Sequence, residues 1–304
     1  MECVITGGAG FIGSHLADAL IAKGRTTVIV DNLVEGKREN INPMARFFKV
    51  DLLRTELFRI FKGADSVFHF AADPFVRRST ENPELSFRQN VLTTFRVLEA
   101  CRKADVKQIV FASSSVVYGE AKQIPTPEDA PLEPISNYGA SKLAGEAYCS
   151  SYAHSYGIRA TVLRYANIFG PRARHGVMWD FYWKLRHNPA RLEILGDGKQ
   201  KKSYLFVSDA ISATLIAAER QKRIFEIFNV GSEEAITVNR IARVVCRELG
   251  VRPRFVYTGG RRGWPGDIPC MLLSIDKLKR LGWRSKVPFV EGVRRYLAWL
   301  RVQG

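Results

Sequence analysis

The sequence lacks several features that mark other classes of protein. Its 304 residues include only five cysteines, which lie far apart and form no Cys-x-x-Cys pair. A disulfide framework and a cysteine-based metal site are therefore not expected. No apolar run reaches the roughly 20 residues that a membrane-spanning helix needs, and the first residues show neither the basic nor the apolar region of a secretory signal. We expect a cytoplasmic protein with no metal site and no membrane segment.

Acidic side chains are scarce in only one half of the chain. Residues 1–150 hold 18 basic and 18 acidic side chains, so the net charge of +16 arises entirely from residues 151–304. Such asymmetry fits a nucleic acid, an acidic surface or a small anionic substrate. Nucleic-acid binding would favour a continuous basic stripe or interleaved aromatic residues. The basic residues are instead spread over the whole half, so we expect no nucleic-acid partner.

The first 165 residues alternate apolar strands with amphipathic helices. Each predicted strand is apolar almost throughout, as expected when helices cover both faces of a parallel sheet. The predicted strands are 2–6, 26–31, 47–50, 66–71, 107–113 and 159–164, and the predicted helices are 11–23, 84–104 and 138–156. This alternation predicts an α/β protein with a doubly wound parallel (Rossmann) sheet.

After residue 165 the alternation becomes less regular. Gly170-Pro171 interrupts the chain, and Gly196-Asp197-Gly198 predicts a turn. A strand at 227–230 is expected to return to the sheet. The remaining helices are predicted at 208–220, 237–249 and 289–301.

These patterns predict two domains that are interleaved along the chain. Residues 1–166 are expected to form the nucleotide-binding domain, together with a return segment near 204–231. Residues 167–203 and 232–304 are expected to form a smaller α/β substrate domain. We find no repeat, low-complexity tract or linker that would separate the two.

The first motif is Thr6-Gly-Gly-Ala-Gly-Phe-Ile-Gly13, between strand 2–6 and helix 11–23. Gly7 permits a tight turn, Gly10 lets the backbone approach a pyrophosphate, and Gly13 lets the helix pack on the strand. The phosphates then lie at the helix N-terminus, among free N–H groups. Asp31 ends the second strand, where a carboxylate binds ribose hydroxyls and repels a 2′-phosphate. The motif predicts NAD binding in preference to NADP, against the alternative of a structural turn beside a solvated aspartate.

A second constellation is Tyr138-Gly-Ala-Ser-Lys142. Positions i and i+4 share one helix face, so the phenol and the ammonium meet. A nearby cation lowers the pKa of a tyrosine and makes it a usable base near neutral pH. Ser113-Ser114-Ser115 stands at the carboxyl end of strand 107–113, the edge at which doubly wound sheets bind ligands. One serine there is expected to hydrogen-bond a reacting hydroxyl, and the other two to satisfy backbone groups.

Further short motifs follow one another along nearly the whole chain. They are TGGAGFIG at 6–13, DNL at 31–33, DL at 51–52, HFAA at 69–72, SSSVVYG at 113–119, YGASK at 138–142, RYANIFGPR at 164–172, GDGKQ at 196–200, VSDA at 207–210 and FNVG at 228–231. In this set and order the chain resembles the extended short-chain dehydrogenase/reductases of the NAD-dependent epimerase/dehydratase family. Within that family it is most similar to the UDP-glucose (UDP-galactose) 4-epimerases.

The resemblance implies a role for each matching residue. It makes Ser114 the catalytic serine, Tyr138 the base, and Lys142 its partner and a contact of the nicotinamide ribose. The implied cofactor contacts are Gly7, Gly10, Phe11, Ile12, Gly13, Asp31, Asn32, Asp51, Leu52, Ala71, Ala72 and Asn90, besides Tyr138 and Lys142. The implied substrate contacts are Ser115, Asn167, Arg77, Arg262, Asp267 and Met271. Arg77 fits a surface role equally well.

Met271 stands at a position that the resemblance makes a gate. In 4-epimerases, the residue four positions after the Asp of the Gly-Asp pair lies beside the sugar. A tyrosine there closes the site to N-acetylhexosamines, and a small residue opens it. A flexible methionine is expected to move aside at modest cost. The alternative is that Met271 only packs in the core of the second domain.

Three departures from the family pattern bear on function. Dehydratases of the family carry Asp-Glu after the catalytic hydroxyl residue, and many decarboxylases keep the Glu, whereas these positions are Ser115 and Val116 here. The Arg-x-Gly-Asp segment that usually contacts the nucleotide corresponds to residues 264–267, which begin with Trp264 in place of the arginine. Either Arg261 or Arg262 therefore supplies the positive charge, or Trp264 stacks on the nucleotide instead. The Arg-Asp that usually follows the GDG motif is Lys202-Ser203, which argues against a ligand role there.

The resemblance implies an NAD-dependent 4-epimerase that interconverts UDP-glucose and UDP-galactose through a 4-keto sugar. The alternatives within the family are a UDP-N-acetylhexosamine or uronate epimerase, a dehydratase or a decarboxylase. A non-catalytic NAD-binding regulator or an RNA-associated protein is disfavoured, because packing alone does not require Ser114, Tyr138 and Lys142 together. In relatives, the helices that correspond to 84–104 and 138–156 pair across subunits, which implies a homodimer.

Overall fold

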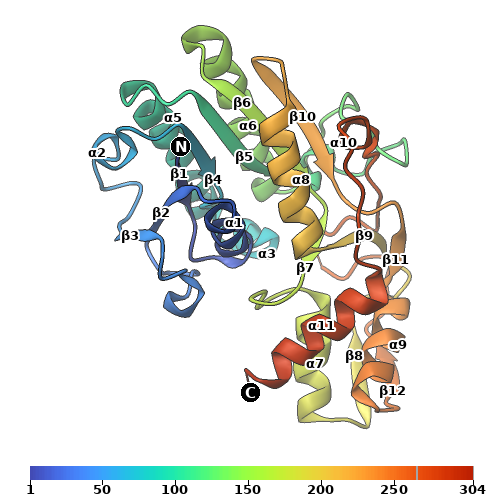
Figure 1. Ribbon diagram of the computed structural model, residues 1–304. Coiled ribbons are helices and arrows are strands. Elements are labelled where there is room, and N and C mark those ends of the chain that lie inside the picture. The colour runs from blue at the N-terminus through green and yellow to red at the C-terminus, as the bar shows by residue number, and fades with distance from the viewer. Residues whose placement is uncertain (265, 304) are drawn as a thin grey trace.

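A sheet of seven parallel strands forms the centre of the computed structural model, which describes residues 1–264 and 266–303 (Figure 1). The strand order is β10-β6-β5-β4-β1-β2-β3. The strands are β1 Glu2–Thr6, β2 Thr26–Asp31, β3 Arg46–Lys49, β4 Ser66–His69, β5 Gln108–Ser114, β6 Arg159–Tyr165 and β10 Phe225–Val230. The order changes direction at β1, which confirms the predicted doubly wound sheet. Pro265, within the predicted nucleotide contact at 264–267, lies outside the described residues.

Helices cover both faces of this sheet. Helices α1 (Phe11–Ala22) and α8 (Val207–Arg220) lie on one face, and α2 (Phe58–Phe61), α5 (Thr93–Lys103) and α6 (Asn137–Tyr156) lie on the other. Successive residues of a strand point to opposite faces. Ile5 of β1 therefore joins the buried cluster that contains Leu16 of α1, whereas Val4 joins the cluster that contains Cys149 of α6. Burial on both faces explains why the strands are apolar throughout.

The predicted helix 84–104 is helical but not uniform. It consists of α4 (Pro83–Ser86), the π-helical turn η2 (Phe87–Leu92) and α5, and it follows the short helix α3 (Val76–Glu81). The π-turn carries the buried Asn90. Two 3-10 turns, η1 (Arg38–Asn40) and η3 (Ser115–Tyr118), follow β2 and β5. Single π-turns are frequent at functional sites, and this one lies beside the predicted cofactor residues.

The later part of the chain forms a second lobe, drawn in the lower half of Figure 1. Strand β9 (Lys201–Phe206) pairs with β7 (Asn167–Phe169), β11 (Ala235–Thr237) and β13 (Cys270–Met271), and β8 (Arg191–Ile194) pairs with β12 (Arg254–Tyr257). Helices α7 (Val177–His187), α9 (Val238–Leu249) and α11 (Phe289–Arg301) pack around these strands. Helix α10 (Asp276–Arg280) lies beside β10 instead.

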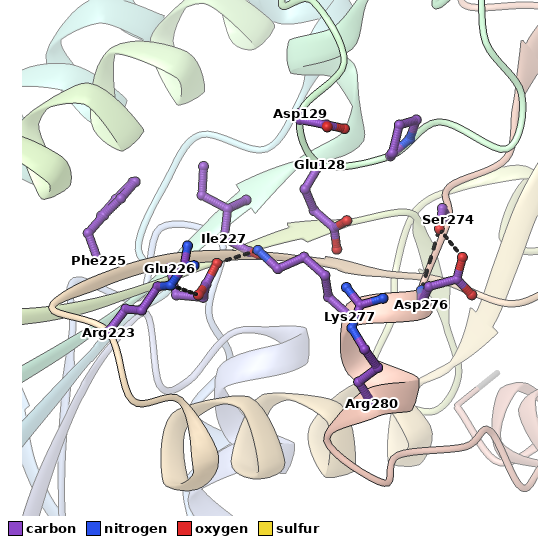
Figure 2. Close-up of a pocket in the computed structure, with 11 residues that line it drawn as sticks. Glu128, Asp129, Arg223, Phe225, Glu226, Ile227, Ser274, Asp276, Lys277 and Arg280 are labelled. Atoms are coloured by element: carbon purple, nitrogen blue, oxygen red, sulfur yellow. Dashed lines mark hydrogen bonds and ion pairs between the residues drawn. The ribbon is translucent and has the colours of Figure 1, made fainter.

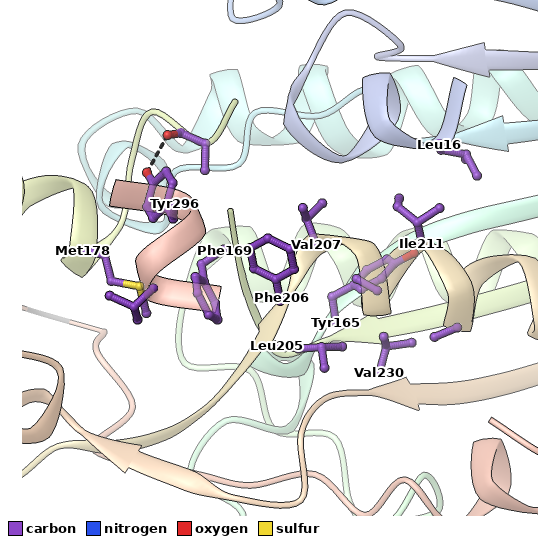
Figure 3. Close-up of a cluster of buried hydrophobic side chains, with 14 of the residues drawn as sticks. Leu16, Tyr165, Phe169, Met178, Leu205, Phe206, Val207, Ile211, Val230 and Tyr296 are labelled. Atoms are coloured by element: carbon purple, nitrogen blue, oxygen red, sulfur yellow. Dashed lines mark hydrogen bonds between the residues drawn. The ribbon is translucent and has the colours of Figure 1, made fainter. Parts of the chain in front are cut away.

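The two lobes share one hydrophobic core. A single buried cluster continues from Leu16 of α1 through Phe206 to Tyr296 of α11 (Figure 3). Strand β10 joins β6, as predicted for the returning strand, whereas residues 204–206 of the predicted return segment belong to β9 of the second sheet. The buried cluster runs through both lobes without a break, so the packing draws no boundary between two domains. The division into two domains stays a prediction.

The VSDA motif at 207–210 has a structural role that ties the last helix to this core. Asp209 is buried, and its Oδ2 accepts hydrogen bonds from the backbone N–H groups of Lys286 (3.0 Å) and Val287 (2.9 Å). The same stretch of chain is held by Trp283, whose Nε1 donates to Ser212 at 2.8 Å. These contacts fix the segment that leads into α11.

The edge strand β10 has a partner on one side only, and charged side chains lie along its other side. Lys277 Nζ donates to the carbonyl of Ile227 at 2.6 Å and pairs with Glu226, and Glu128 Oε1 accepts from Asn229 N at 2.9 Å. Figure 2 shows Lys277 and Glu128 in an open cavity of about 510 Å³. None of the predicted site residues is among the described residues that line this cavity.

Two further searches concern the described residues alone. Over residues 1–264 and 266–303, no helix combines the length and apolar character needed to cross a membrane. Within the same ranges, no three His, Cys, Asp or Glu side chains gather closely enough to hold a metal ion. Four cysteines are buried, and Cys270 of β13 is exposed.

The contact between α6 and β5 allows a test of the packing. A Cβ on Gly145 would lie 2.4 Å from Cζ of Phe111. Although alanine favours a helix over glycine by about 1 kcal/mol, we expect Gly145→Ala to lower the free energy of unfolding by about 1–3 kcal/mol because of overpacking. Urea denaturation measures this loss. The double variant Phe111→Leu/Gly145→Ala should lose less than the sum of the two single variants, and additive losses would contradict the contact.

Candidate active site

The loop between β1 and α1 presses its backbone against the end of β4. Gly7 has a φ of 72°, and a Cβ there would lie 2.6 Å from the backbone N of Ala71. A Cβ on Gly13 would lie 2.3 Å from the carbonyl oxygen of Gly7, so both positions require glycine. Helix α1 starts after Gly10 with no side-chain cap and no acidic residue in its first turn. The first N–H groups of α1, those of Phe11, Ile12 and Gly13, are therefore suited to an anion.

Asp31 lies at the end of β2 and holds this loop in place. Its Oδ2 accepts from Ala9 N at 3.0 Å and its Oδ1 from Leu33 N at 2.8 Å. Leu33 adopts a φ of 61°, which bends the chain back toward the carboxylate. Burial raises the pKa of Asp31, and the two backbone hydrogen bonds oppose that rise. Each carboxylate oxygen has a second lone pair, so both remain available to ribose hydroxyls.

The other predicted cofactor residues lie in the turns that follow β2, β3 and β4. Asn32 is exposed and accepts from Val34 N at 3.0 Å. Asp51 Oδ1 accepts from Leu53 N at 2.9 Å, and the carbonyl of Leu52 accepts from Arg96 Nε at 3.0 Å. Ala71 and Ala72 follow β4 and are half-buried. The carboxyl ends of neighbouring parallel strands thus bring these residues to one edge of the sheet.

Asn90 fixes the segment that follows β4 through hydrogen bonds to its backbone. Its Oδ1 accepts from Asp73 N at 2.8 Å, and its Nδ2 donates to the carbonyl of Asp73 at 3.2 Å and to Ser141 Oγ at 3.0 Å. These bonds give Asn90 a structural role in placing Ala71 and Ala72. A direct contact with the cofactor stays a prediction.

His69 completes this frame, and the sequence analysis assigned it no role. Thr94 Oγ1 donates its only proton to the carbonyl of Asn90 at 2.6 Å, so His69 Nε2 must donate to Thr94 Oγ1 at 3.0 Å. His69 Nδ1 then accepts from Thr6 Oγ1 at 2.7 Å. Burial lowers the pKa of His69 to about 3, which keeps the ring neutral. The sequence held one indication of this role, because His69 is the single polar residue of the otherwise apolar HFAA motif.

Tyr138, Lys142 and Ser114 meet where β5 ends. Ser136 caps α6 by accepting from Gly139 N at 3.1 Å, which places Tyr138 in the first turn of the helix. The Ser114 hydroxyl lies close enough to the Tyr138 phenol to lower its pKa. Lys142 is buried, with its Nζ donating to the carbonyl of Ala112 at 2.9 Å and lying 5.8 Å from the centre of the Tyr138 ring. Two helix positions and one strand end therefore form a single polar group.

The electrostatics of this group differ from the prediction in one respect. We expected Lys142 to lower the pKa of Tyr138, but burial raises the pKa of Tyr138 to about 12, against the opposing effect of the Ser114 hydroxyl. The negative charge of Asp73 raises it further. The physical reason is that the Lys142 ammonium points at a β5 carbonyl rather than at the phenol. Burial also lowers the pKa of Lys142 to about 8.

Two of the predicted substrate residues, Asn167 and Met271, lie on strands of the second lobe. Asn167 is on β7, and its Nδ2 donates to the carbonyl of Ser203 on β9 at 3.1 Å. Ser115 is buried in η3, directly after Ser114. Met271 is buried in a small cluster with Val117, and Val116 packs against that cluster. Met271 therefore packs in a core and lies next to η3, so both of its predicted roles remain compatible with the structure.

Asp267, which is buried, and Lys202, which is half-buried, form an ion pair that no sequence pattern predicted. Lys202 Nζ lies 2.5 Å from Asp267 Oδ1, with side-chain exposures of 14% and 2%. Lys202 Nζ also lies 5.3 Å from the centre of the Trp264 ring, and Asp267 Oδ2 accepts from Gly263 N at 3.0 Å. The replacement of Arg-Asp by Lys202-Ser203 argued against a ligand role. The structure instead gives Lys202 a defined place beside Trp264.

Two predicted arginines are engaged by other side chains. Arg262 Nη1 donates to the carbonyl of Asp267 at 3.2 Å, and its Nη2 pairs with Glu120. Arg77 is 79% exposed and pairs with Glu81 one turn along α3, at 3.2 Å. The exposure of Arg77 favours the surface role over the substrate role, and its contact with substrate stays untested.

Comparison with known proteins identifies the family. The chain matches the model of the NAD dependent epimerase/dehydratase family over residues 3–231. The chain belongs to the NAD-dependent epimerase/dehydratase family. It is 38% identical over 305 residues to a putative UDP-glucose 4-epimerase of Methanocaldococcus jannaschii, with 98% of each chain covered.

Solved structures agree with this assignment. A crystal structure of UDP-galactose 4-epimerase is 46% identical, has a TM-score of 0.91, and is matched over 100% of this chain and 99% of that chain. The UDP-N-acetylglucosamine 4-epimerase of Methanobrevibacter ruminantium is 32% identical, has a TM-score of 0.92, and is matched over the same shares. This epimerase/dehydratase family member is thus an NAD-dependent epimerase-type enzyme with the predicted fold.

The residues at this edge of the sheet fit NAD. The uncapped start of α1 has no acidic neighbour in its first turn to repel a pyrophosphate. Asp31 offers a buried carboxylate at the end of β2, and Lys142 offers an ammonium at the end of β5. An uncapped helix, a carboxylate and an ammonium are the groups that pyrophosphate and two riboses require.

Asp31 should determine the choice of cofactor. We expect the cofactor-free native enzyme to prefer NAD, because Asp31 repels a 2′-phosphate. In Asp31→Asn the preference should shift toward NADP by about tenfold or more, the equivalent of about 1.4 kcal/mol. Fluorescence titration with both cofactors measures the ratio. Preferential NADP binding by the native enzyme would contradict the assignment.

Proposed function

We propose that this enzyme interconverts UDP-glucose and UDP-galactose by inverting C4 of the hexose through a 4-keto intermediate. The observation that carries the proposal is the group formed by Ser114, Tyr138 and Lys142, at the same edge of the sheet as the uncapped start of α1. This group supplies a proton acceptor for a sugar hydroxyl next to a fitting cofactor site. The names of the similar enzymes from M. jannaschii and in the solved structure support UDP-hexoses as substrates.

In the proposed reaction Tyr138 accepts the proton of the C4 hydroxyl, directly or through the neighbouring Ser114. NAD, when bound, supplies the acceptor of the C4 hydride and later its donor. Because burial raises the pKa of Tyr138, removal of its own proton needs positive charge nearby. The Lys142 ammonium, 5.8 Å from the centre of the ring, supplies such a charge once it turns from the Ala112 carbonyl toward the phenol.

The sugar has to turn over within the site, so it cannot be held tightly. We therefore propose that most of the binding energy comes from the UDP part of the substrate. Lys202, Trp264 and Asp267 offer a cation, an aromatic ring and a carboxylate in one place on the second lobe. The cation matches the diphosphate, the aromatic ring matches the uracil, and the carboxylate matches the ribose.

Other substrates within the family are the second candidate. Solved relatives are named for UDP-N-acetylglucosamine and for UDP-glucuronic acid, and one similar enzyme is named a UDP-N-acetyl-alpha-D-glucosaminuronate decarboxylase. Ser115 and Val116 place no carboxyl group in η3 after Ser114. The lack of an acid at these two positions favours epimerisation over dehydration and decarboxylation.

We also propose a cytoplasmic homodimer without a nucleic-acid partner. Phe95 of α5 and Tyr148 of α6 are 38% and 41% exposed, and their rings meet edge to face at 5.9 Å. Exposed aromatic residues on adjoining helices favour an interface. Sedimentation measurements on the purified enzyme test the dimer.

A screen of UDP-sugars by nuclear magnetic resonance tests the proposed reaction. The purified enzyme, with NAD, is incubated separately with UDP-galactose, UDP-glucose, UDP-N-acetylglucosamine and UDP-glucuronic acid. We expect the inverted C4 signal to appear from UDP-galactose and UDP-glucose. Turnover of the uronate alone would replace the proposal with the second candidate.

Tyr138→Phe should abolish turnover while leaving the fold and the NAD content largely intact. Loss of the base is expected to lower the rate by on the order of 10²- to 10⁴-fold. The measurement is the initial rate with UDP-galactose, alongside circular dichroism and the amount of bound NAD. Near-normal activity in this variant would show that Tyr138 is not the base.

Met271 should decide whether N-acetylated sugars are accepted. We expect the native enzyme to turn over UDP-N-acetylglucosamine at least weakly, because an unbranched thioether side chain moves aside where a ring cannot. Met271→Tyr should lose this activity and keep that with UDP-galactose. If the native enzyme ignores the N-acetylated sugar, or the Tyr variant accepts it equally well, Met271 is only a packing residue.

A further inference from the structure

A buried ion pair lies directly behind the catalytic end of β5. Arg164 Nη2 lies 2.7 Å from Glu146 Oε2, and the side chains are 1% and 4% exposed. Arg164 Nε also donates to Glu146 Oε1 at 3.0 Å, and Ser113 Oγ donates to the same oxygen at 2.5 Å. The carboxylate of Glu146 thus joins α6, β5 and β6 at one point.

The pair continues into a chain of hydrogen bonds. Arg164 Nη1 donates to Tyr118 Oη and to the carbonyl of Glu128, both at 2.8 Å. Tyr118 Oη donates in turn to Asn229 Oδ1 at 2.8 Å. The chain therefore connects the strand end of β5 with η3 and with the edge strand β10.

Stability alone does not account for these charges. Taking two ions out of water costs as much as their attraction returns, and well-packed apolar side chains often serve equally well. The position of Glu146 suggests a different reason. Glu146 lies one helical turn after Lys142, and Ser113, which it binds, directly precedes Ser114. Ser113 and Arg164 are also direct neighbours in the β5–β6 register.

We propose that Glu146 is a positioning residue for the reaction, which fixes α6 against the catalytic end of β5 and keeps Lys142 in its charged form. This inference rests on the proposed roles of Tyr138 and Lys142. Glu146 itself acts through those groups and touches neither sugar nor cofactor in the proposed reaction.

Among the groups around Lys142, Glu146 is the one whose negative charge favours the protonated form of Lys142. Burial lowers the pKa of Lys142 to about 8, while the charges of Cys149 and Glu146 act in the opposite direction. Burial raises the pKa of Cys149, so its thiol is neutral at neutral pH. The remaining titratable or charged groups that face this region are Tyr138 on α6, His69 on β4, Asp73 after β4 and Arg164 on β6. Glu146 is therefore the anion through which the protein opposes the desolvation of Lys142.

Glu146→Gln tests the proposal through pH dependence. Without the carboxylate, Lys142 should lose its proton at lower pH, so the alkaline limb of the rate profile with UDP-galactose should move down by about one pH unit or more. The titration of the Lys142 ammonium, measured by nuclear magnetic resonance as the difference from the matching Lys142→Met protein, should move to lower pH by the same amount. A merely structural role of Glu146 would move neither curve.

Tyr118→Phe is the matched control. It removes two hydrogen bonds of the same buried chain and no charge near Lys142. We expect it to lower the melting temperature and leave both pH curves in place. If Glu146→Gln fails to fold, the double variant Glu146→Gln/Arg164→Met removes both ions. The pH curves should then shift in the same direction by a smaller amount, because the positive charge of Arg164 no longer disfavours the charged form of Lys142.

The outcomes separate this proposal from the proposed function. Unchanged pH curves in Glu146→Gln, or equal shifts in Tyr118→Phe, would overturn the role of Glu146. If the native enzyme turns over no UDP-hexose, the proposed function fails, but the titration of Lys142 still decides whether Glu146 controls its charge. Recovery of the native curves by Glu146→Asp, which restores the charge, would support the proposal.

Discussion

Burial of both faces of the central parallel sheet is the constraint on which the rest of the structure depends. With helices on both sides, the strands have no solvent-facing side for polar residues. Polar groups therefore collect where strands end, as with Asp31 at the end of β2, Asp73 after β4 and Ser114 at the end of β5. Parallel strands put all these ends at one edge, so residues far apart in the sequence meet there. The chemistry of the site is a consequence of how the core is covered.

Much of this arrangement follows from local sequence patterns. The glycine spacing before α1 and the four-residue spacing of Tyr138 and Lys142 are short-range signals, and a helix or turn converts them directly into geometry. The same holds for the apolar runs of β1, β2 and β5, whose bounds differ from the predicted ones by at most one residue. The frame of the cofactor site was therefore predictable, and so was the meeting of Ser114, Tyr138 and Lys142 at the end of β5.

The remainder depends on contacts between distant residues. Strands β7, β8, β12 and β13 have two to four residues each, too few for a periodic signal. Lys202 and Asp267 are 65 positions apart, and no local pattern pairs them. The pKa of Tyr138 depends on its burial and on the direction of one flexible ammonium group. Such properties arise from packing and side-chain rotamers, which spacing along the chain does not encode.

The side chains along β10 have a consequence for how the molecule behaves in a crowded solution. An open strand edge is a template on which another chain extends the sheet, and this is a route to aggregation. On β10 the Ile227 carbonyl and the Asn229 N–H are already bonded to Lys277 and Glu128. An incoming strand would have to displace both charged groups and leave each without its partner. The sheet is thereby closed to extension at this end.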